Sequence, residues 1–306
     1  MQKMSARDGG VFAVVVSFHP DLSVLGRLLD ALQHQVSGIV VVDNGSPATF
    51  QEWLKSFHVS IPLRLLALGE NRGIASAQNV GIDYAREQGA EFVILFDHDS
   101  NPAPDMVARL LAVVEAKRLE GVAVGGVGPR YLDERQDNPP PFIQVNGLRV
   151  ERQPCCSDDS VVEVSYLIAS GCLIPLRTLE VVGNMHEELF IDYVDIEWGL
   201  RAASKGFTSF GACGAKMAHD LGDEPIRFMG KSYPQHSPLR HYYHFRNAVW
   251  LYRRNWVPFN WKVADGWRLL LKYGFYTLFA KPRYRQWLMM SKGVWHGVTG
   301  KMGQLK

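Results

Sequence analysis

Two aspartates stand two residues apart in Asp97-His98-Asp99, directly after the apolar run Phe92–Phe96. Carboxylates at this spacing can both reach one hard cation such as Mg²⁺ or Mn²⁺. A cation held between carboxylates and a diphosphate neutralises charge on a leaving group. A solvated acidic turn that caps the next helix would show the same pattern. The position directly after an apolar strand favours the metal site.

Further polar residues follow two earlier apolar runs. Asp43 and Asn44 precede a Gly-Ser pair, and a carboxylate there can bind the imide N–H of a pyrimidine base or a ribose hydroxyl. The alternative is an Asx turn with glycine at positive φ. Arg72 and Gly73 stand at a predicted helix start, where backbone N–H groups suit an anion or a base edge. The alternative there is an ordinary helix cap with a surface arginine.

The segment Phe190–Arg201 contains a candidate general base. Asp195 fits the start of a predicted helix, and Asp192 lies just before it. A carboxylate that faces a cleft can accept the proton of an acceptor hydroxyl, whereas a capping aspartate only stabilises its helix. Further along, His219 has either a structural role or one as a metal ligand or diphosphate contact.

The first hundred residues alternate between strand-like apolar runs and helix-like patterns. The four runs are Val11–Phe18, Gly38–Asp43, Leu63–Ala67 and Phe92–Phe96. This alternation with short connections predicts an α/β fold with a mostly parallel, doubly wound sheet. Ligands of such sheets bind beyond the carboxyl ends of the strands. We therefore expect Ser17, Asp43-Asn44 and Asp97-His98-Asp99 to meet at one edge.

The regular alternation changes after about residue 100, and the chain becomes rich in aromatic and basic residues from about residue 240. We divide the chain into a catalytic domain, residues 1–239, with a nucleotide-binding half at 11–100 and an acceptor half at 101–239. Residues 240–306 combine basic residues with six tryptophans. Such a composition on amphipathic helices suits a membrane interface. Alternatively, the aromatic side chains pack onto the catalytic domain.

Composition excludes several classes of protein. A net charge of +2 argues against nucleic acid as a partner, and 47% hydrophobic residues are ordinary for a globular protein. The N-terminus lacks the apolar stretch of a signal peptide, and no apolar run is long enough to cross a membrane. Four cysteines without a C-x-x-C pair, two of them adjacent, predict free thiols and a reducing compartment.

The motifs together resemble a known family. They are VVVSFHP, VVVDNGS, LGENRGIASAQNVGI, ILFDHDS, SGCLIP, ELFIDYVDIEWGLRA, MAHDLGD and LRHYYHFRN, between about residues 11 and 255. The set resembles bacterial family 2 glycosyltransferases, and among them most resembles the L-rhamnosyltransferases that build O-antigens, other polysaccharides and rhamnolipids. The resemblance implies a GT-A fold, an inverting transfer and Mg²⁺ or Mn²⁺ as cofactor.

On the donor side, the resemblance assigns nucleotide contacts to Ser17 and Phe18, and a base contact to Asp43 with its neighbour Asn44. Arg72, Gly73 and Asn79 match the segment that lines the nucleotide pocket. Asp97 would lie near the ribose and the metal, and Asp99 would coordinate the metal. His219 matches a histidine near the metal, and Arg246 matches a residue that meets the diphosphate.

On the acceptor side, the family pattern is Glu-Asp before a helix. Here Val194 replaces the glutamate, so the general base falls on Asp195, with Asp192 as the backup. The resemblance implies dTDP-L-rhamnose as donor and a saccharide or lipid-linked acceptor. It also implies a cytoplasmic location, with attachment to the inner face of the plasma membrane.

Two other functions compete. A nucleotidyltransferase would carry a Gly-rich basic loop after the first strand, where this chain has His19-Pro20-Asp21. A dehydrogenase is excluded more strongly, because no G-x-G-x-x-G follows that strand. The non-enzyme alternative is a carbohydrate- or lipid-surface-binding protein with a dead site, against which the retained Asp97, Asp99 and Asp195 argue.

Overall fold

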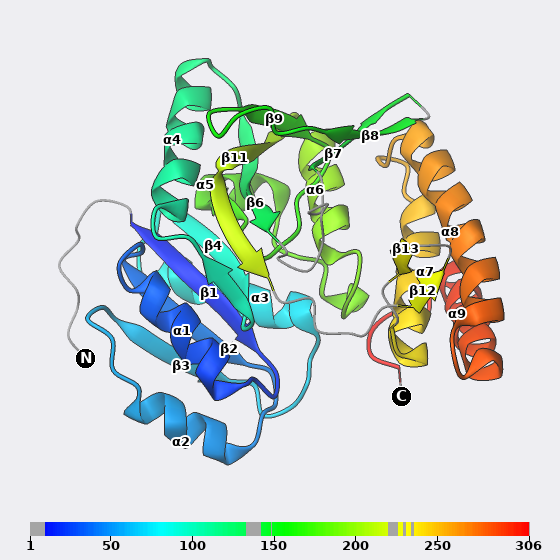
Figure 1. Ribbon diagram of the computed structural model, residues 1–306, viewed down its shortest axis with the longest axis horizontal. Helices are drawn as coiled ribbons and strands as arrows, with labels where there is room; N and C mark the ends of the chain where they lie inside the picture. Colours follow the sequence, from blue (N-terminus) through cyan, green and yellow to red (C-terminus); the bar gives the residue numbers. More distant parts are fainter. Residues whose placement is uncertain are drawn as a thin grey trace.

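A parallel sheet forms the first half of the protein. The computed structural model describes residues 10–132, 142–147, 149–219, 226–228, 231–233 and 236–305. Strands β1 (Val11–Ser17), β2 (Gly38–Asp43), β3 (Leu63–Ala67) and β4 (Phe92–Asp97) lie in the order β3-β2-β1-β4, all parallel (Figure 1). Helices α1 (Leu22–Leu32), α2 (Ala48–Ser56) and α3 (Ile74–Glu87) connect them. The predicted doubly wound α/β arrangement is confirmed.

Both faces of this sheet are covered, which explains the continuous apolar runs. Side chains alternate across a strand, so Ala13 and Val15 pack with α1 and α4 (Met106–Leu119), while Val14 and Val16 pack on the opposite face with α3. A strand that is buried on both faces has no position for a polar side chain until it ends. The polar residues therefore stand at the strand ends.

The second half extends the sheet with mixed strand directions. Strand β10 (Leu173–Pro175) lies antiparallel between β4 and β6 (Val124–Leu132). Strand β11 (Thr208–His219) runs parallel to β6 and also pairs with β5 (Ser100–Pro102) and β9 (Val161–Val164). Helix α5 (Leu176–Val182), the short η1 (Glu187–Leu189) and α6 (Val194–Ser204) lie beside the sheet. The smaller strand pairs are β7 (Phe142–Asn146) with β8 (Arg149–Gln153), and β12 (Ile226–Phe228) with β13 (Lys231–Tyr233).

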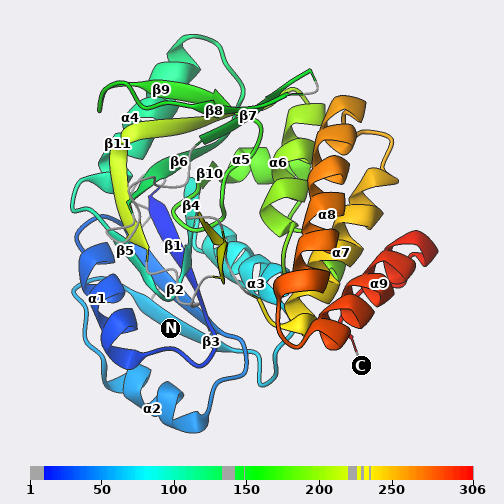
Figure 2. The same cartoon turned by 45° about the vertical axis from the view of Figure 1, so that its right-hand side comes forward.

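Three helices complete the described chain at the side opposite α1 and α2 (Figure 2). They are α7 (Pro238–Tyr252), α8 (Phe259–Phe279) and α9 (Arg283–Thr299). A Cβ on Gly293 would lie 2.4 Å from Tyr242 O, so this glycine lets α9 approach α7 closely. Among the described residues, no helix has the length and apolar character to cross a membrane.

Some of the C-terminal aromatic residues pack onto the catalytic domain, and the membrane interface stays a prediction. Trp250 and Trp261 are buried in the same hydrophobic cluster as strands β1 and β4. Trp267, Trp287 and Trp295 are exposed. Residues of α7 and α8 thus share a core with the sheet, and α7 starts at Pro238. The division into domains at residues 239 and 240 stays a prediction.

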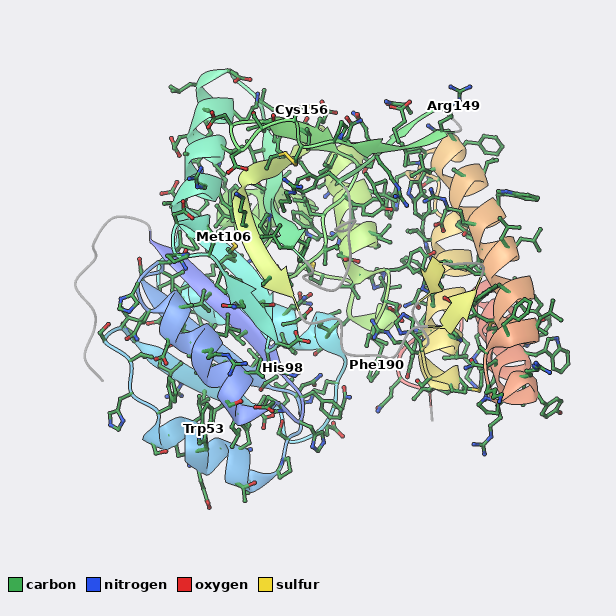
Figure 3. All side chains as sticks on the ribbon, viewed as in Figure 1. Trp53, His98, Met106, Arg149, Cys156 and Phe190 are labelled. Atoms are coloured by element: carbon green, nitrogen blue, oxygen red, sulfur yellow. A yellow bond between two sulfur atoms is a disulfide. The ribbon has the colours of Figure 1, made fainter. Side chains whose placement is uncertain are left out.

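The prediction that all cysteines are free thiols is wrong. Cys155 and Cys213 form a disulfide with their Cα atoms 5.5 Å apart, whereas Cys156 and Cys172 are free. Figure 3 shows this bond beside the labelled Cys156. The partners are 58 residues apart in sequence and meet because β9 pairs with β11 and Cys213 N donates to Ser160 O. The argument from free thiols to a reducing compartment therefore loses its basis.

Candidate active site

Strand register brings the predicted donor-binding residues to one edge of the sheet. Ser17 at the end of β1 lies opposite Asp43 at the end of β2, and Val16 lies opposite Asp97 at the end of β4. Neighbouring parallel strands are about 4.8 Å apart. Ser17, Asp43 and Asp97 therefore mark the ends of three adjacent strands, as the strand pattern predicts.

Beside Asp43, the loop that follows β2 and the loop that follows β3 are hydrogen-bonded to each other. Asp43 is fully buried and accepts hydrogen bonds from Ser46 N at 2.9 Å and Gln51 Nε2 at 3.3 Å. Asn44 Oδ1 accepts from Arg72 N at 2.8 Å. Gly45, at φ 99°, allows this contact, because a Cβ there would lie 2.8 Å from the carbonyl carbon of Glu70. Asp43 therefore closes this turn through Ser46 N, with glycine at positive φ, and nucleotide contacts through Asp43 and Asn44 stay predictions.

Three other residues at this edge remain available to a ligand. Phe18 and Arg72 have exposed side chains, and Arg72 makes only a loose ion pair with Glu70, 3.7 Å away. The buried Ser17 Oγ has no hydrogen-bond partner among the described residues. A buried hydroxyl without a partner is unfavourable unless a ligand or water completes it. This edge of the sheet therefore suits a polar, partly aromatic ligand.

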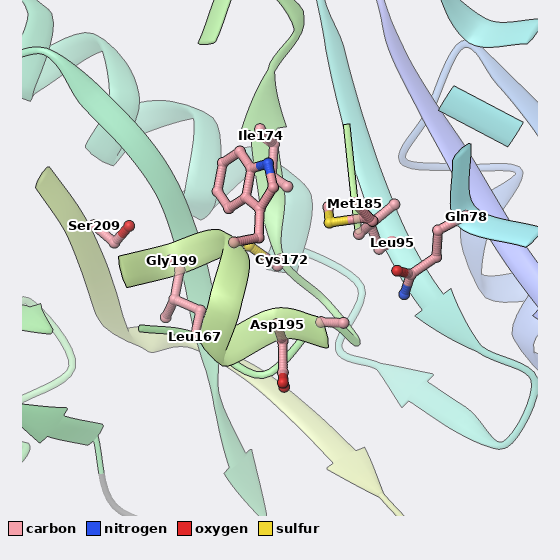
Figure 4. Close-up of a pocket in the computed structure, with 11 residues that line it drawn as sticks. Gln78, Leu95, Leu167, Cys172, Ile174, Met185, Asp195, Gly199 and Ser209 are labelled. Carbon is pink, nitrogen blue, oxygen red and sulfur yellow. The ribbon is translucent and has the colours of Figure 1, made fainter. Parts of the chain in front are cut away.

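Asp195 lies in the first turn of α6 and lines a small cavity under that helix, together with Gln78, Cys172 and Met185 (Figure 4). Burial, and then the negative charges of Asp192 and Asp97, raise the pKa of Asp195 to about 6, although Ile196 N donates to its carboxylate at 2.8 Å. Asp97 and Asp195 therefore lie close enough to interact electrostatically. A carboxylate that titrates near neutral pH is suited to act as a general base.

The backbone before α6 is strained. Phe190, Asp192 and Tyr193 have φ values of 67°, 62° and 63°. Non-glycine residues rarely adopt such angles, and each such residue costs about 1–3 kcal/mol unless its surroundings impose it. Strain of this kind gathers at functional sites. The strain in segment 190–193 therefore supports the neighbouring Asp195 as a candidate functional residue.

Arg246 and Asn247 on α7 impose this backbone conformation. Asn247 Nδ2 lies 2.8–2.9 Å from the carbonyl oxygens of Leu189, Ile191 and Asp192. The guanidinium of Arg246 donates to the carbonyls of Glu188 and Leu189, and is fully buried. In this structure the guanidinium nitrogens of Arg246 hold the loop, and its contact with the diphosphate stays a prediction. The importance of Asn247 could not be inferred from local sequence.

From the first half of the chain, Gly73 lies against Phe190, and Asn79 holds Met185, which precedes the segment. Asn79 Nδ2 donates to Met185 O at 3.0 Å, and its Oδ1 accepts from Met185 N at 2.9 Å. Both ends of the amide thus bind Met185, and the nucleotide contact of Asn79 stays a prediction. Gly73 has φ 86°, and a Cβ there would lie 2.6 Å from Phe190 O. Ile74 N donates to that same oxygen at 2.7 Å.

Asp192, the predicted backup base, differs from Asp195 in its surroundings. Its Oδ1 accepts from Arg240 Nε at 3.4 Å. Its buried Oδ2 has no hydrogen-bond partner among the described residues. Burial raises the pKa of Asp192, and Arg240 opposes that rise. This arrangement leaves one carboxylate oxygen that can accept a hydrogen bond from a ligand.

The Asp97–Asp99 turn suits a cation that also takes ligands from its substrate. Both side chains are partly exposed. Ser170, which the sequence reasoning did not consider, positions the turn, because its Oγ accepts from Asp97 N at 3.2 Å and lies 2.6 Å from Ser100 Oγ. No cluster of three or more His, Cys, Asp or Glu ligands occurs within the described residues. Two carboxylates completed by substrate phosphates match Mg²⁺ chemistry.

His219 can be placed only by its backbone. Its position in β11 is opposite Ser100 in β5, next to the Asp97–Asp99 turn. Its side chain, and Asp220 with the residues up to 225, lie outside the described residues. A metal contact by His219 therefore stays a prediction.

Known proteins resemble this chain in sequence and in fold. Glycosyl transferase family 2 matches residues 13–159. The dTDP-rhamnosyl transferase RfbF of Shigella flexneri is 37% identical over 253 residues, 82% of each chain. The S. aureus TarS 1–349 structure with UDP-GlcNAc has a TM-score of 0.60 at 16% identity, covering 94% of this chain and 81% of that one. GalNAc-T7, with UDP, GalNAc and Mn²⁺, has a TM-score of 0.56 at 13% identity, covering 89% of this chain.

The similarities in sequence and in fold agree with the sheet topology described above. The chain spans 58% of the length of GalNAc-T7, and at such low identity the solved structures show the fold alone. That fold is the predicted GT-A type, with a mostly parallel sheet and a helical C-terminal extension. The relative at 37% identity covers most of both chains. On this evidence the chain belongs to the family 2 glycosyltransferases.

Proposed function

We propose that this enzyme transfers L-rhamnose from dTDP-L-rhamnose to a hydroxyl of a saccharide or lipid-linked acceptor, with inversion at the anomeric carbon. The name of the 37% identical relative supports the donor. The observation that carries the reaction is the position of Asp195, partly buried, with a pKa raised to about 6 and within electrostatic reach of Asp97. An acceptor hydroxyl between these two residues would meet a base on one side and the donor on the other.

The proposed step is one in-line displacement. Asp195 accepts the proton of the acceptor hydroxyl as its oxygen bonds to the anomeric carbon, and the bond from that carbon to the diphosphate oxygen breaks. The electron pair of the broken bond leaves with the nucleoside diphosphate. Positioning and charge stabilisation account for most of the acceleration in such a reaction. A divalent cation bound at Asp97 and Asp99 would neutralise charge on the diphosphate.

Other residues have positioning roles in this proposal. Phe18 would stack on the base, and the exposed Arg72 would contact the nucleotide. Ser17 Oγ would gain the hydrogen-bond partner that it lacks among the described residues. Asp192 Oδ2 would orient the acceptor through a hydrogen bond. We place the reaction in the cytoplasm on the family resemblance alone, since the cysteine argument no longer supports it.

The test compares donors and the Asp195→Asn variant. Purified enzyme with Mg²⁺ or Mn²⁺ is given dTDP-L-rhamnose, dTDP-D-glucose or UDP-GlcNAc, and release of nucleoside diphosphate is measured with and without saccharide acceptors. We expect turnover with dTDP-L-rhamnose only, and a loss of at least 100-fold in Asp195→Asn with donor binding retained. Preference for another donor would overturn the sugar assignment. Full activity of the variant would overturn the base, and donor binding without any turnover would indicate a binding protein.

A further inference from the structure

We propose that the outer face of α8 and α9 docks on an anionic lipid bilayer. On α8, exposed apolar side chains recur at positions 259, 263, 267, 270, 271 and 278, the spacing of one helix face. They are Phe259, Val263, Trp267, Leu270, Leu271 and Leu278. Phe259 is 78% exposed and Trp267 is 62% exposed. Burial inside the protein therefore does not explain this row.

Helix α9 repeats the pattern. Its exposed apolar side chains are Tyr284, Trp287, Leu288, Trp295 and Val298, with Trp295 at 65%. The two helices are linked by residues 280–282, and Tyr273 Oη lies 2.7 Å from Ser291 Oγ between them. Their buried rows, which include Trp261, Leu269 and Met290, belong to the core cluster. The exposed rows therefore lie on the sides of α8 and α9 that face away from the core, and Figure 1 shows the two helices at its right-hand edge.

Charge decides which partner fits this surface. Exposed basic residues accompany the rows, among them Arg268, Lys281, Arg283, Arg285, Lys292 and Lys301. Asp265 is the only acidic residue from position 255 to 305. Its carboxylate accepts hydrogen bonds from Tyr193 Oη at 2.9 Å and Tyr252 Oη at 2.6 Å. This aromatic–basic face, the eleven apolar and six basic side chains named above, thus carries only positive charge.

An anionic bilayer matches this face better than a second copy of the chain does. A symmetric dimer through this face would set the same cationic surface against itself. Lipid headgroups supply negative charge, while exposed tryptophan and leucine side chains can enter the interface. Helix α8 also contacts the catalytic segment, since Tyr193 precedes α6 and binds Asp265. Docking would therefore place α8 between the lipid surface and the segment that precedes Asp195.

Vesicle sedimentation of the full chain tests the proposal. Vesicles of phosphatidylcholine alone are compared with vesicles containing 30% phosphatidylglycerol as the probe, roughly the charge density of an anionic membrane. We expect binding to the anionic vesicles, at least ten-fold weaker binding to the neutral ones, and release at high salt. Trp267→Ser with Leu271→Ser should weaken binding at least ten-fold, and Arg283→Gln with Arg285→Gln should weaken it several-fold.

The matched control is Leu119→Ser with Val181→Ser, which removes exposed apolar side chains from α4 and α5. This control should bind as the wild type does, and circular dichroism should show all variants folded. Equal binding of the Trp267/Leu271 variant, or no binding by the wild type, overturns the proposal. A dimer in solution that the same variant makes monomeric, without vesicle binding, assigns the face to a second copy and also overturns it. None of these measurements depends on the donor sugar.

Discussion

At the scale of single residues, the site combines a carboxylate with a raised pKa and a rim of residues at strand ends. Asp195 sits among negative neighbours and apolar cavity walls, so its charged form is disfavoured. The same burial that makes it a better base opposes the stability of the fold. Two predictions separate these consequences.

The first concerns the pH dependence of activity. The base must be ionised, so kcat/KM for the acceptor should fall about ten-fold per pH unit below the pKa of Asp195. Asp192→Asn removes a nearby negative charge that raises this pKa. The acid limb of the profile should therefore move to lower pH in Asp192→Asn, whatever the change in maximal rate. Coincident acid limbs in the two proteins would contradict this assignment.

The second concerns stability. The pKa of Asp195 is higher in the folded protein than its ordinary value of 3.8. Between pH 4 and 6 the folded state therefore binds more protons than the unfolded state does. The stability that this group contributes is lost as pH rises through that window. Asp195→Asn should therefore raise the free energy of unfolding at pH 7.5 by about 1–2 kcal/mol, with little effect near pH 4. Urea titrations at the two pH values measure it, and destabilisation at pH 7.5 would contradict it.

At the scale of elements, the segment before α6 is held from two sides. Gly73, just before α3, lets the backbone approach Phe190, and Asn79 on α3 binds Met185, while α7 contributes Arg246 and Asn247. The side chains of Asn79, Arg246 and Asn247 bind backbone carbonyls and amides, so these contacts do not depend on the side chains of the segment. A positive φ at three residues persists because the contacts on both sides impose it.

Removing one of these contacts should slow the reaction and leave donor binding nearly unchanged. Asn247→Ala leaves the carbonyls of Leu189, Ile191 and Asp192 without this donor and should destabilise the fold by about 2–3 kcal/mol. We expect kcat to fall at least ten-fold with little change in donor KM, because the segment positions Asp192 and Asp195. Asn101→Ala, an exposed position, is the control. Kinetics and thermal unfolding check both effects, and wild-type values in Asn247→Ala would refute the role.

At the scale of the whole molecule, one hydrophobic cluster joins the sheet to α7, α8 and α9. The C-terminal helices therefore share a core with the sheet that carries the candidate site, and they also present the aromatic–basic face. The Cys155–Cys213 disulfide joins the segment before β9 to β11, at the other end of the sheet extension.

Loss of that disulfide should lower stability. Cross-links over loops of this length stabilise by about 2–4 kcal/mol, so Cys155→Ser should lower the melting temperature by several degrees, and reductant should do the same to the wild type. Cys156→Ser changes an exposed free thiol and should have no effect. Thiol titration under non-reducing, denaturing conditions should find two free thiols. Four would show that the bridge is absent in solution.

The order of strands and helices in the first hundred residues could be read from the sequence, because burial on both faces leaves a local signature of continuous apolar runs. The ends of these runs then placed Ser17, Asp43 and Asp97 at one edge of the sheet. A separate helix pattern placed Asp195 at a helix start. The sequence motifs also indicated the family. All these signals lie within a few neighbouring residues.

Only the tertiary structure decided how the remaining side chains are used. Arg246 and Asn79 carry polar groups that suit a nucleotide, yet packing turns them toward backbone atoms 57 and 106 residues away. Cys155 forms a disulfide with Cys213 instead of remaining free. The tryptophans of residues 240–306 differ in burial, since some lie in the core and others on the surface. These outcomes depend on which segments the sheet and helices bring together. A residue type states what a side chain can bond, and the fold determines which partner is within reach.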